Sequence, residues 1–118
     1  ESPFLVMSAV QSRIRDLMIF RQALDAGWLT LADSGRGAVV KWKEVPPEIE
    51  EAFTEQFERD PRTIHPYRAG LLATQAKGFS LRKLAQCQRA AIQAHEKMVS
   101  SAVPDETILE LLLIRMLS

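Results

Sequence analysis

The sequence contains little cysteine and histidine. Cys87 is the only cysteine among 118 residues, which excludes a disulfide bond within the chain. The two histidines, His65 and His95, lie far apart and form no Cys/His pattern with the spacing of a zinc site. We therefore expect no structural metal and no cofactor, and the cysteine usage favours a cytoplasmic location.

Long hydrophobic runs are also absent. The nearest approach is 108–117, which Glu110 and Arg115 interrupt, whereas a membrane-spanning helix needs roughly 18 or more apolar residues. The chain begins at Glu1 without an initiator methionine and without the segments of a signal peptide. We expect no membrane association and a single domain over residues 1–118, a length that also suits a fragment excised from a larger protein.

Prolines, glycines and N-cap residues divide the chain into helical segments. Ser2 and Pro3 suit the start of a first helix and Gly27 its end, while Pro104 and Asp105 separate off the last helix. The sequence thus predicts a mainly α fold with about five helices and one wing-like β-hairpin between the first and second helices. The expected helices span residues 3–26, 47–58, 66–77, 81–99 and 105–117, and the expected hairpin spans 28–43.

The hairpin is predicted from β-branched and aromatic residues on either side of a glycine-rich segment. Residues 28–31 and 38–43 form the expected strands, and 33–37 form the expected turn. Two strands alone are marginally stable in water. We therefore expect one apolar face of the hairpin to pack on helices. Its expected members are Trp28, Leu31, Val40 and Trp42.

Charge is distributed unevenly although the net charge is zero. Residues 62–97 carry seven cations and one anion, a balance of 7 − 1 = +6, and residues 48–60 carry six anions and one cation, a balance of 1 − 6 = −5. Such a contrast between neighbouring segments indicates a polyanion or an acidic partner as ligand, while a solvated helical face gives the same pattern. The sequence leaves both interpretations open.

The helix expected at 81–98 sorts its residues onto two faces. The apolar face contains Leu81, Leu84, Ala85, Ala91, Ile92, Met98 and Val99, and the polar face contains Arg82, Gln86, Arg89, Gln93 and Glu96. Arginine and glutamine side chains can read base edges in a major groove, and lysine and arginine neutralise phosphates. The polar face therefore suits DNA, and the alternative is an ordinary solvated face.

The segment 74–84 resembles a helix-turn-helix motif at Gly78, Ser80 and Leu84. Lys77 and Thr74 depart from the motif, which usually has an apolar residue and a small alanine at these positions. The resemblance implies that the helix after the turn enters a DNA groove. An ordinary helical hairpin that ends at a glycine would have the same sequence pattern.

Three further segments resemble the end of a winged-helix domain. They are 21–30, 35–37 and 39–42, which read as the end of a helix, a turn and a strand. The resemblance implies that the helix before the hairpin reads DNA and that the wing tip touches phosphate. The matching positions are Arg13, Arg15, Arg21 and Arg36. A single helix precedes the hairpin here, whereas the winged-helix family has two more before its recognition helix.

Catalytic chemistry is not expected. The carboxylates at 50–58 have helical spacing but nothing places two of them in a cleft, and Cys87 and His95 lie two helical turns apart on one expected helix. The main prediction is a non-enzymatic DNA-binding module of a replication, transfer or regulatory protein. The predicted groove or phosphate contacts are Arg82, Lys83, Gln86 and Arg89, and the predicted backbone contacts are Lys77, Arg68 and Arg36.

The alternative is a protein-interaction or oligomerisation domain. It would dock through its acidic helix, its basic helix or its apolar last helix. The last helix, 105–117, has apolar residues around its whole circumference, which demands burial on nearly every side. We expect it to be a central core helix, and the other interpretation is a contact between two copies of the chain.

Overall fold

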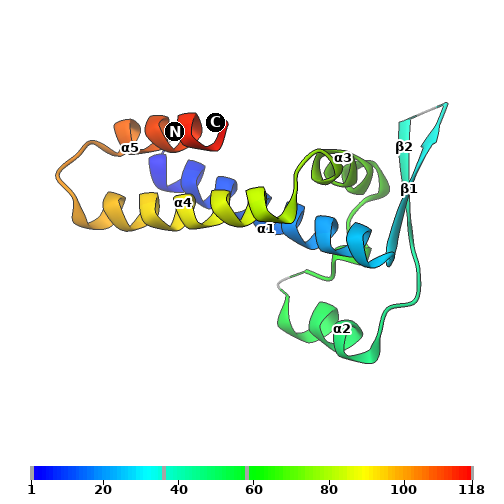
Figure 1. Cartoon of the computed structure of the whole chain (residues 1–118). Coiled ribbons are helices and arrows are strands. Elements are labelled where there is room, and N and C mark those ends of the chain that lie inside the picture. Colours follow the sequence, from blue (N-terminus) through cyan, green and yellow to red (C-terminus); the bar gives the residue numbers. More distant parts are fainter. Residues whose placement is uncertain (1, 36, 58, 118) are drawn as a thin grey trace. The chain divides into compact units, whose positions relative to one another are not determined.

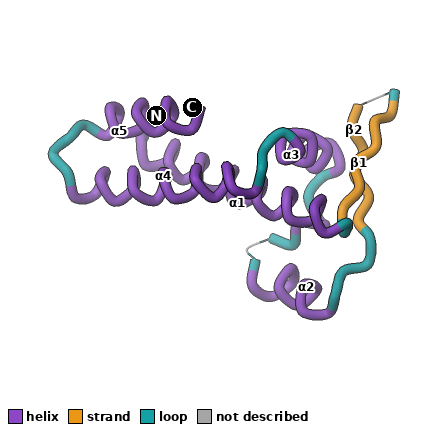
Figure 2. The backbone as a smooth tube through the Cα atoms, viewed as in Figure 1, coloured by secondary structure: helices purple, strands orange, loops and turns teal. Residues whose placement is uncertain are grey.

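The computed structural model describes residues 2–35, 37–57 and 59–117. Within these residues it is mainly helical, with five helices and one antiparallel hairpin between α1 and α2, which confirms the predicted fold class (Figures 1 and 2). The elements are α1 (Pro3–Ala26), β1 (Leu29–Ser34), β2 (Gly37–Trp42), α2 (Pro47–Glu51), the π-helical turn η1 (Ala52–Gln56), the 3-10 turn η2 (Pro61–Thr63), α3 (Pro66–Lys77), α4 (Leu81–Ser100) and α5 (Asp105–Leu117).

The chain forms two compact units. Unit 1 comprises the described residues of 1–15 and 81–118, and unit 2 comprises the described residues of 16–80. Helix α1 contributes its first half to unit 1 and its second half to unit 2. Among the described helices, none combines the length and the apolar content needed to cross a bilayer.

In unit 2, α1 ends where the sequence predicts. Gly27 has a φ of +80°, a conformation that glycine adopts without steric cost. The amide of Trp28 donates to the carbonyl oxygen of Ala23 at 2.9 Å, and the amide of Gly27 donates to that of Leu24 at 3.2 Å. This pair of hydrogen bonds is a Schellman motif, which satisfies the last carbonyls of the helix and turns the chain into β1.

The register of the hairpin corrects two details of the prediction. Strand β1 extends to Ser34 and β2 begins at Gly37, so the predicted turn at 33–37 is too long. Gly37 takes part in the strand pairing although its φ is +114°, which few other residues tolerate. Leu29 pairs with Trp42 and Leu31 with Val40, so Leu29, and not Trp28, shares the packed face with them.

Helix α3 covers the hairpin, mainly through β2. Its buried face consists of small residues and one leucine: Ala69, Gly70, Leu72, Ala73 and Ala76. At Gly70 the backbone of Ala38 approaches so closely that no side chain fits between them. The mid-helix glycine is therefore required by the contact between helix and strand, which no pattern in the sequence indicates.

Gly70→Ala is expected to lower the free energy of unfolding by about 1–3 kcal/mol, because the new methyl group would overlap the carbonyl oxygen of Ala38. Urea denaturation measures this change. Gly78→Ala is the matched control, since its Cβ would lie 3.4 Å from the oxygen of Gln75 and its φ of −79° suits alanine. Equal stability of the Gly70 variant and the wild type would show that α3 does not pack on β2 this closely.

A chain of aromatic rings holds the rest of unit 2 together. Phe20 of α1 meets Trp42 of β2 edge to face at 5.8 Å between ring centroids, and Trp42 meets Phe53 of η1 in the same way at 5.8 Å.

The helix predicted at 47–58 starts correctly at Pro47, but it continues beyond Glu51 as a π-helical turn and ends at Gln56. The hydroxyl of Thr54 donates to the carbonyl oxygen of Glu50 at 3.0 Å.

In unit 1, α5 packs against α4, and the first half of α1 completes the core. The buried residues of α4 are Leu84, Cys87, Ala90, Ala91, Ala94 and Met98. The predicted apolar face of α4 is therefore partly wrong: Ile92 and Val99 are exposed, while Cys87, Ala90 and Ala94 are buried. Small alanines lie under α5 because they allow two helix axes to approach closely.

The expectation that α5 is buried on nearly every side is wrong. Its buried residues are Ile108, Leu109 and Leu112. The apolar residues on its other side remain exposed to solvent. One strip of α5 belongs to the core of unit 1, and the rest of its circumference is in contact with solvent.

Candidate functional site

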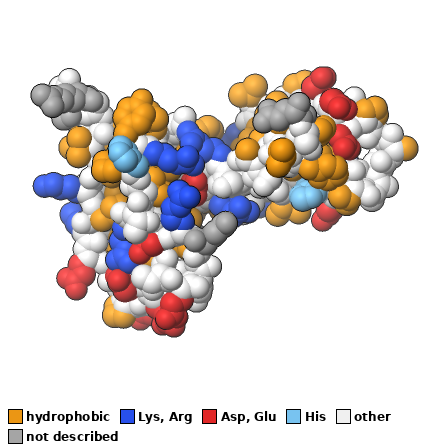
Figure 3. All heavy atoms as spheres, turned by 180° about the vertical axis from the view of Figure 1, so that it is seen from behind, with side chains coloured by type: hydrophobic (Ala, Val, Ile, Leu, Met, Phe, Trp, Pro, Cys, Tyr) orange, Lys and Arg blue, Asp and Glu red, His pale blue; other side chains and the backbone are white. Residues whose placement is uncertain are grey.

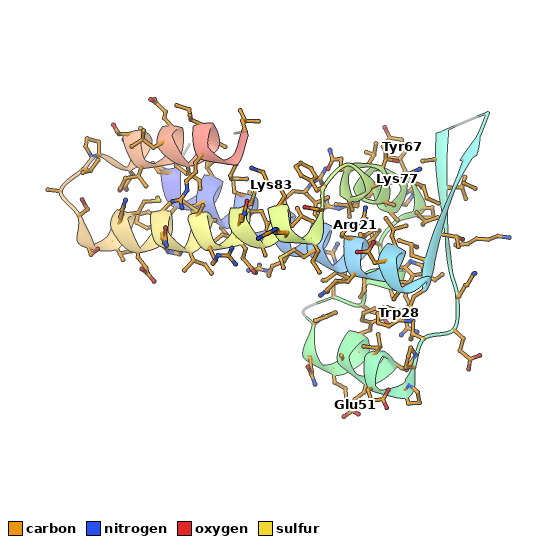
Figure 4. The ribbon with its side chains drawn as sticks, viewed as in Figure 1. Arg21, Trp28, Glu51, Tyr67, Lys77 and Lys83 are labelled. Atoms are coloured by element: carbon orange, nitrogen blue, oxygen red, sulfur yellow. The ribbon has the colours of Figure 1, made fainter. Side chains whose placement is uncertain are left out.

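Three of the residues predicted to contact DNA line one pocket of unit 1. The pocket has a volume of about 290 Å³ and lies between α4 and the last turn of α5. Lys83, Gln86 and Arg89 contribute from α4, and Lys83 lies near the end of α5 in Figure 4. The sequence therefore identified part of a surface that the fold brings together.

Arg115 is the one cation of this pocket's described lining that is not among the predicted contacts. It lies on α5, and its Nη1 donates a hydrogen bond to Oε1 of Gln93 on α4 at 3.2 Å. Arg115 joins Lys83 and Arg89 in the lining, so three cations meet there. The sequence shows Arg115 only as an interruption of an apolar run. Its position depends on α5 folding back on α4, which local patterns do not predict.

A second pocket, of about 140 Å³, adjoins the first. Its lining is mostly apolar and includes Ala94, Ile108, Leu111 and Leu112. Ala90, Gln93 and Arg115 line both pockets, so the two form one continuous depression between α4 and α5. We call it the α4–α5 groove. It has a cationic end at Lys83 and an apolar end at Val103.

The solvent side of α5 is apolar next to this groove. Leu111, Leu113, Ile114 and Leu117 are exposed to 61%, 45%, 63% and 88%. We call these four residues the outward face of α5. Figure 3 shows hydrophobic side chains at the surface of unit 1, seen from behind. An exposed apolar patch of neighbouring large side chains is typical of a surface that another molecule covers.

The remaining predicted contacts do not join the groove. Arg82 is exposed on α4 but does not belong to the lining of either pocket. Lys77 and Arg68 belong to unit 2, where Arg68 pairs with Asp16 at 3.7 Å. Arg36 lies outside the described residues.

Neither DNA-binding resemblance is confirmed. The two helices of the supposed helix-turn-helix, α3 and α4, belong to different compact units, whereas such a motif packs its helices as one body. Arg21, a matching position in the winged-helix resemblance, has a structural role. Its Nη1 donates to the carbonyl oxygen of Lys77 at 3.2 Å and its Nη2 pairs with Asp25 at 2.6 Å, so it caps the end of α3 (Figure 4).

The acidic segment makes its strongest contacts with one residue of the basic block. Arg62 pairs with Glu50 at 2.6 Å and with Asp60 at 2.7 Å, and its guanidinium lies 5.5 Å from the ring centroid of Phe53. The hydrogen bond from Arg62 lowers the pKa of Asp60 below its ordinary value. These contacts fix η2 against α2 and η1.

Metal-ligating side chains do not cluster in the part of the chain that the structure describes. No group of three or more His, Cys, Asp and Glu side chains there could hold an ion. Cys87 is buried in the core of unit 1. The α4–α5 groove and the outward face of α5 are therefore the two surfaces that we consider as candidate binding sites.

The comparison with protein families covers more than half of the chain. Residues 50–116 match the model described as the C-terminal domain of the DNA polymerase III delta subunit. The match begins within α2 and includes all of α3 and α4 and nearly all of α5. No curated protein and no solved structure matches the chain significantly.

Proposed function

This chain belongs to the family formed by the C-terminal domain of the DNA polymerase III delta subunit, and from this membership we propose that it is a non-enzymatic protein-interaction domain of a replication complex. Its partner is another subunit of that polymerase. The proposal corresponds to the alternative that the sequence left open, docking through the apolar last helix.

The outward face of α5 carries this proposal. Leu111, Leu113, Ile114 and Leu117 lie on the side of α5 opposite to buried Leu112, and Glu110 and Thr107 are among the few polar residues between them. Full burial of one leucine or isoleucine side chain contributes about 1.5–3 kcal/mol. A partner that covers these four side chains would therefore gain a large part of its binding free energy from them.

Direct DNA binding stays a prediction for this chain. Three of its seven predicted contacts, Lys83, Gln86 and Arg89, lie together in the α4–α5 groove. The affinity of a protein for nucleic acid comes largely from cationic side chains that contact phosphates, and leucine side chains do not contribute to it. The apolar outward face of α5 thus supports a protein partner better than a nucleic acid.

The test is assembly with the other polymerase III subunits of the source organism. The double variant Leu113→Ser with Leu117→Ser removes two exposed side chains that do not line the groove. We expect its Kd for the reconstituted subunits to rise at least about tenfold, because each removed side chain loses burial in the complex. Sedimentation velocity and titration calorimetry measure the change.

Leu71→Ser is the matched control, since Leu71 of α3 is 46% exposed and Leu113 is 45% exposed. Both variants should change the free energy of unfolding by at most about 0.5 kcal/mol, as most surface substitutions do. Assembly of the double variant with wild-type affinity would contradict the proposal. A stable homodimer formed through this face by the isolated chain would contradict it as well.

A further inference from the structure

The lining of the α4–α5 groove has one sign of charge. Lys83, Arg89 and Arg115 meet at the cationic end, and Lys97 lies at the apolar end. Among the described residues, the linings of the two pockets contain no aspartate or glutamate. The groove therefore presents a positive field beside an apolar floor, although the whole chain has a net charge of zero.

The length of the groove matches that of a short helix lying along it. Its α4 wall runs from Lys83 to Lys97, which corresponds to about 21 Å at 1.5 Å per residue. A partner helix of about 14 residues, or four turns, has the same length. Laying an amphipathic helix into an apolar groove is a recurrent way in which one protein recognises another.

We propose that the α4–α5 groove binds an acidic amphipathic helix that the partner presents. The apolar stripe of that helix lies on the exposed side chains of Val103 and Leu111, and its carboxylates pair with Arg89 and Arg115. This inference rests on the proposed function and specifies the chemistry of the partner. The outward face of α5 continues the groove at Leu111, so one partner covers both surfaces.

One further feature favours carboxylates on a helix over phosphates of a nucleic acid. The apolar end of the groove contains Ile108, Leu111 and Leu112, which offer no hydrogen bond to a phosphate. Gln93 already holds the guanidinium of Arg115 by a hydrogen bond of 3.2 Å. This contact orients the planar donor group of Arg115, and such a group binds a carboxylate or a phosphate equally well through two parallel hydrogen bonds, so the choice between them rests on the apolar end.

The probe is a synthetic helical peptide of about 14 residues with leucines at i, i+3, i+4 and i+7 spacing and glutamates in one terminal turn. It is prepared with the glutamates at either end, because the groove accepts a helix in two directions. A twin peptide has lysine in place of each glutamate. We expect the acidic peptide to bind the full chain, with amide shifts at Val103 and Leu111, and the lysine twin not to bind.

Arg89→Glu with Arg115→Glu reverses two charges of the groove. We expect the Kd of the acidic peptide to rise at least about tenfold and the lysine twin to bind this variant instead. Arg82→Glu is the matched control, because Arg82 is an exposed arginine of α4 outside the lining. The Kd of the acidic peptide for this control variant should stay within about twofold of its value for the wild type. Circular dichroism checks that each variant keeps its helical content.

Three results would overturn the inference. They are an unchanged Kd in the double charge variant, amide shifts confined to residues outside α4 and α5, and displacement of the peptide by a DNA duplex that binds the same residues more tightly. The assembly assay separates this inference from the proposed function. If Leu113→Ser with Leu117→Ser abolishes assembly while the charge variant assembles normally, the groove proposal fails and the proposed function stands.

Discussion

Replacement of Leu112 by alanine is expected to lower the free energy of unfolding by about 2–5 kcal/mol. Leu112 is only 3% exposed and lies on the strip of α5 that packs in unit 1. Alanine removes buried apolar area and leaves a cavity that the neighbouring helices fill incompletely. Urea denaturation of the chain, followed by circular dichroism, measures the loss.

Leu117→Ala is the control for this prediction. Leu117 lies on the same helix but is 88% exposed, so its replacement should change stability by at most about 0.5 kcal/mol. The melting temperature of the wild type should also not depend on protein concentration, because Leu112 is buried within one chain. Equal effects of the two substitutions would show that the two sides of α5 are assigned wrongly.

Replacement of Phe20 by alanine is expected to cost about 3–5 kcal/mol, the largest effect that we predict for unit 2. Phe20 is fully buried and its ring meets Trp42 edge to face. The substitution removes this ring contact and leaves a cavity between α1 and β2. Loss of the near-ultraviolet circular dichroism of the two tryptophans on heating should occur at a lower temperature than in the wild type.

Phe4→Ala serves as the comparison, because Phe4 is 43% exposed at the start of α1 and meets only the ring of His95 among the aromatic contacts of the described residues. Its loss should cost at most about 1.5 kcal/mol. If both substitutions destabilised the chain equally, the aromatic chain from Phe20 through Trp42 would not be the main support of unit 2.

The boundaries of the helices were predictable because single residues set them. Pro3 and Gly27 bound α1, Pro66 begins α3, and Asp105 begins α5 as the sequence predicts. Proline and glycine act through their own backbone preferences, which do not depend on the rest of the fold. The π-helical continuation at 52–56 is not marked by any proline, glycine or capping residue at its start.

The covered faces of α4 and α5 were harder to predict. Hydrophobicity shows which side chains favour burial but not which helix is close enough to bury them. Ala90 and Ala94 are buried because α5 lies on them, and Ile92 and Val99 are larger and yet exposed. The same limit applies to Arg115, whose place in the groove depends on the turn between α4 and α5.

The DNA-binding predictions illustrate a different limit. Gly78 and Ser80 resemble a helix-turn-helix turn, but a short motif does not say whether its helices share one core. Arg21 resembles a base-reading residue and instead binds the carbonyl oxygen of Lys77. The sequence alone does not show whether an arginine binds a phosphate or the carbonyl oxygens at the end of a helix.

The division of the chain has a consequence for its synthesis on the ribosome. Unit 1 is assembled from both ends of the sequence, with residues 16–80 inserted between its parts. A nascent chain therefore exposes the apolar residues Met7 and Ile14 of α1 while unit 2 is already complete, and these residues gain their cover only after α4 and α5 have been translated. Until then the nascent chain carries an exposed apolar segment of the kind that chaperones bind. A chain that terminates after unit 2 would leave this segment permanently exposed to solvent.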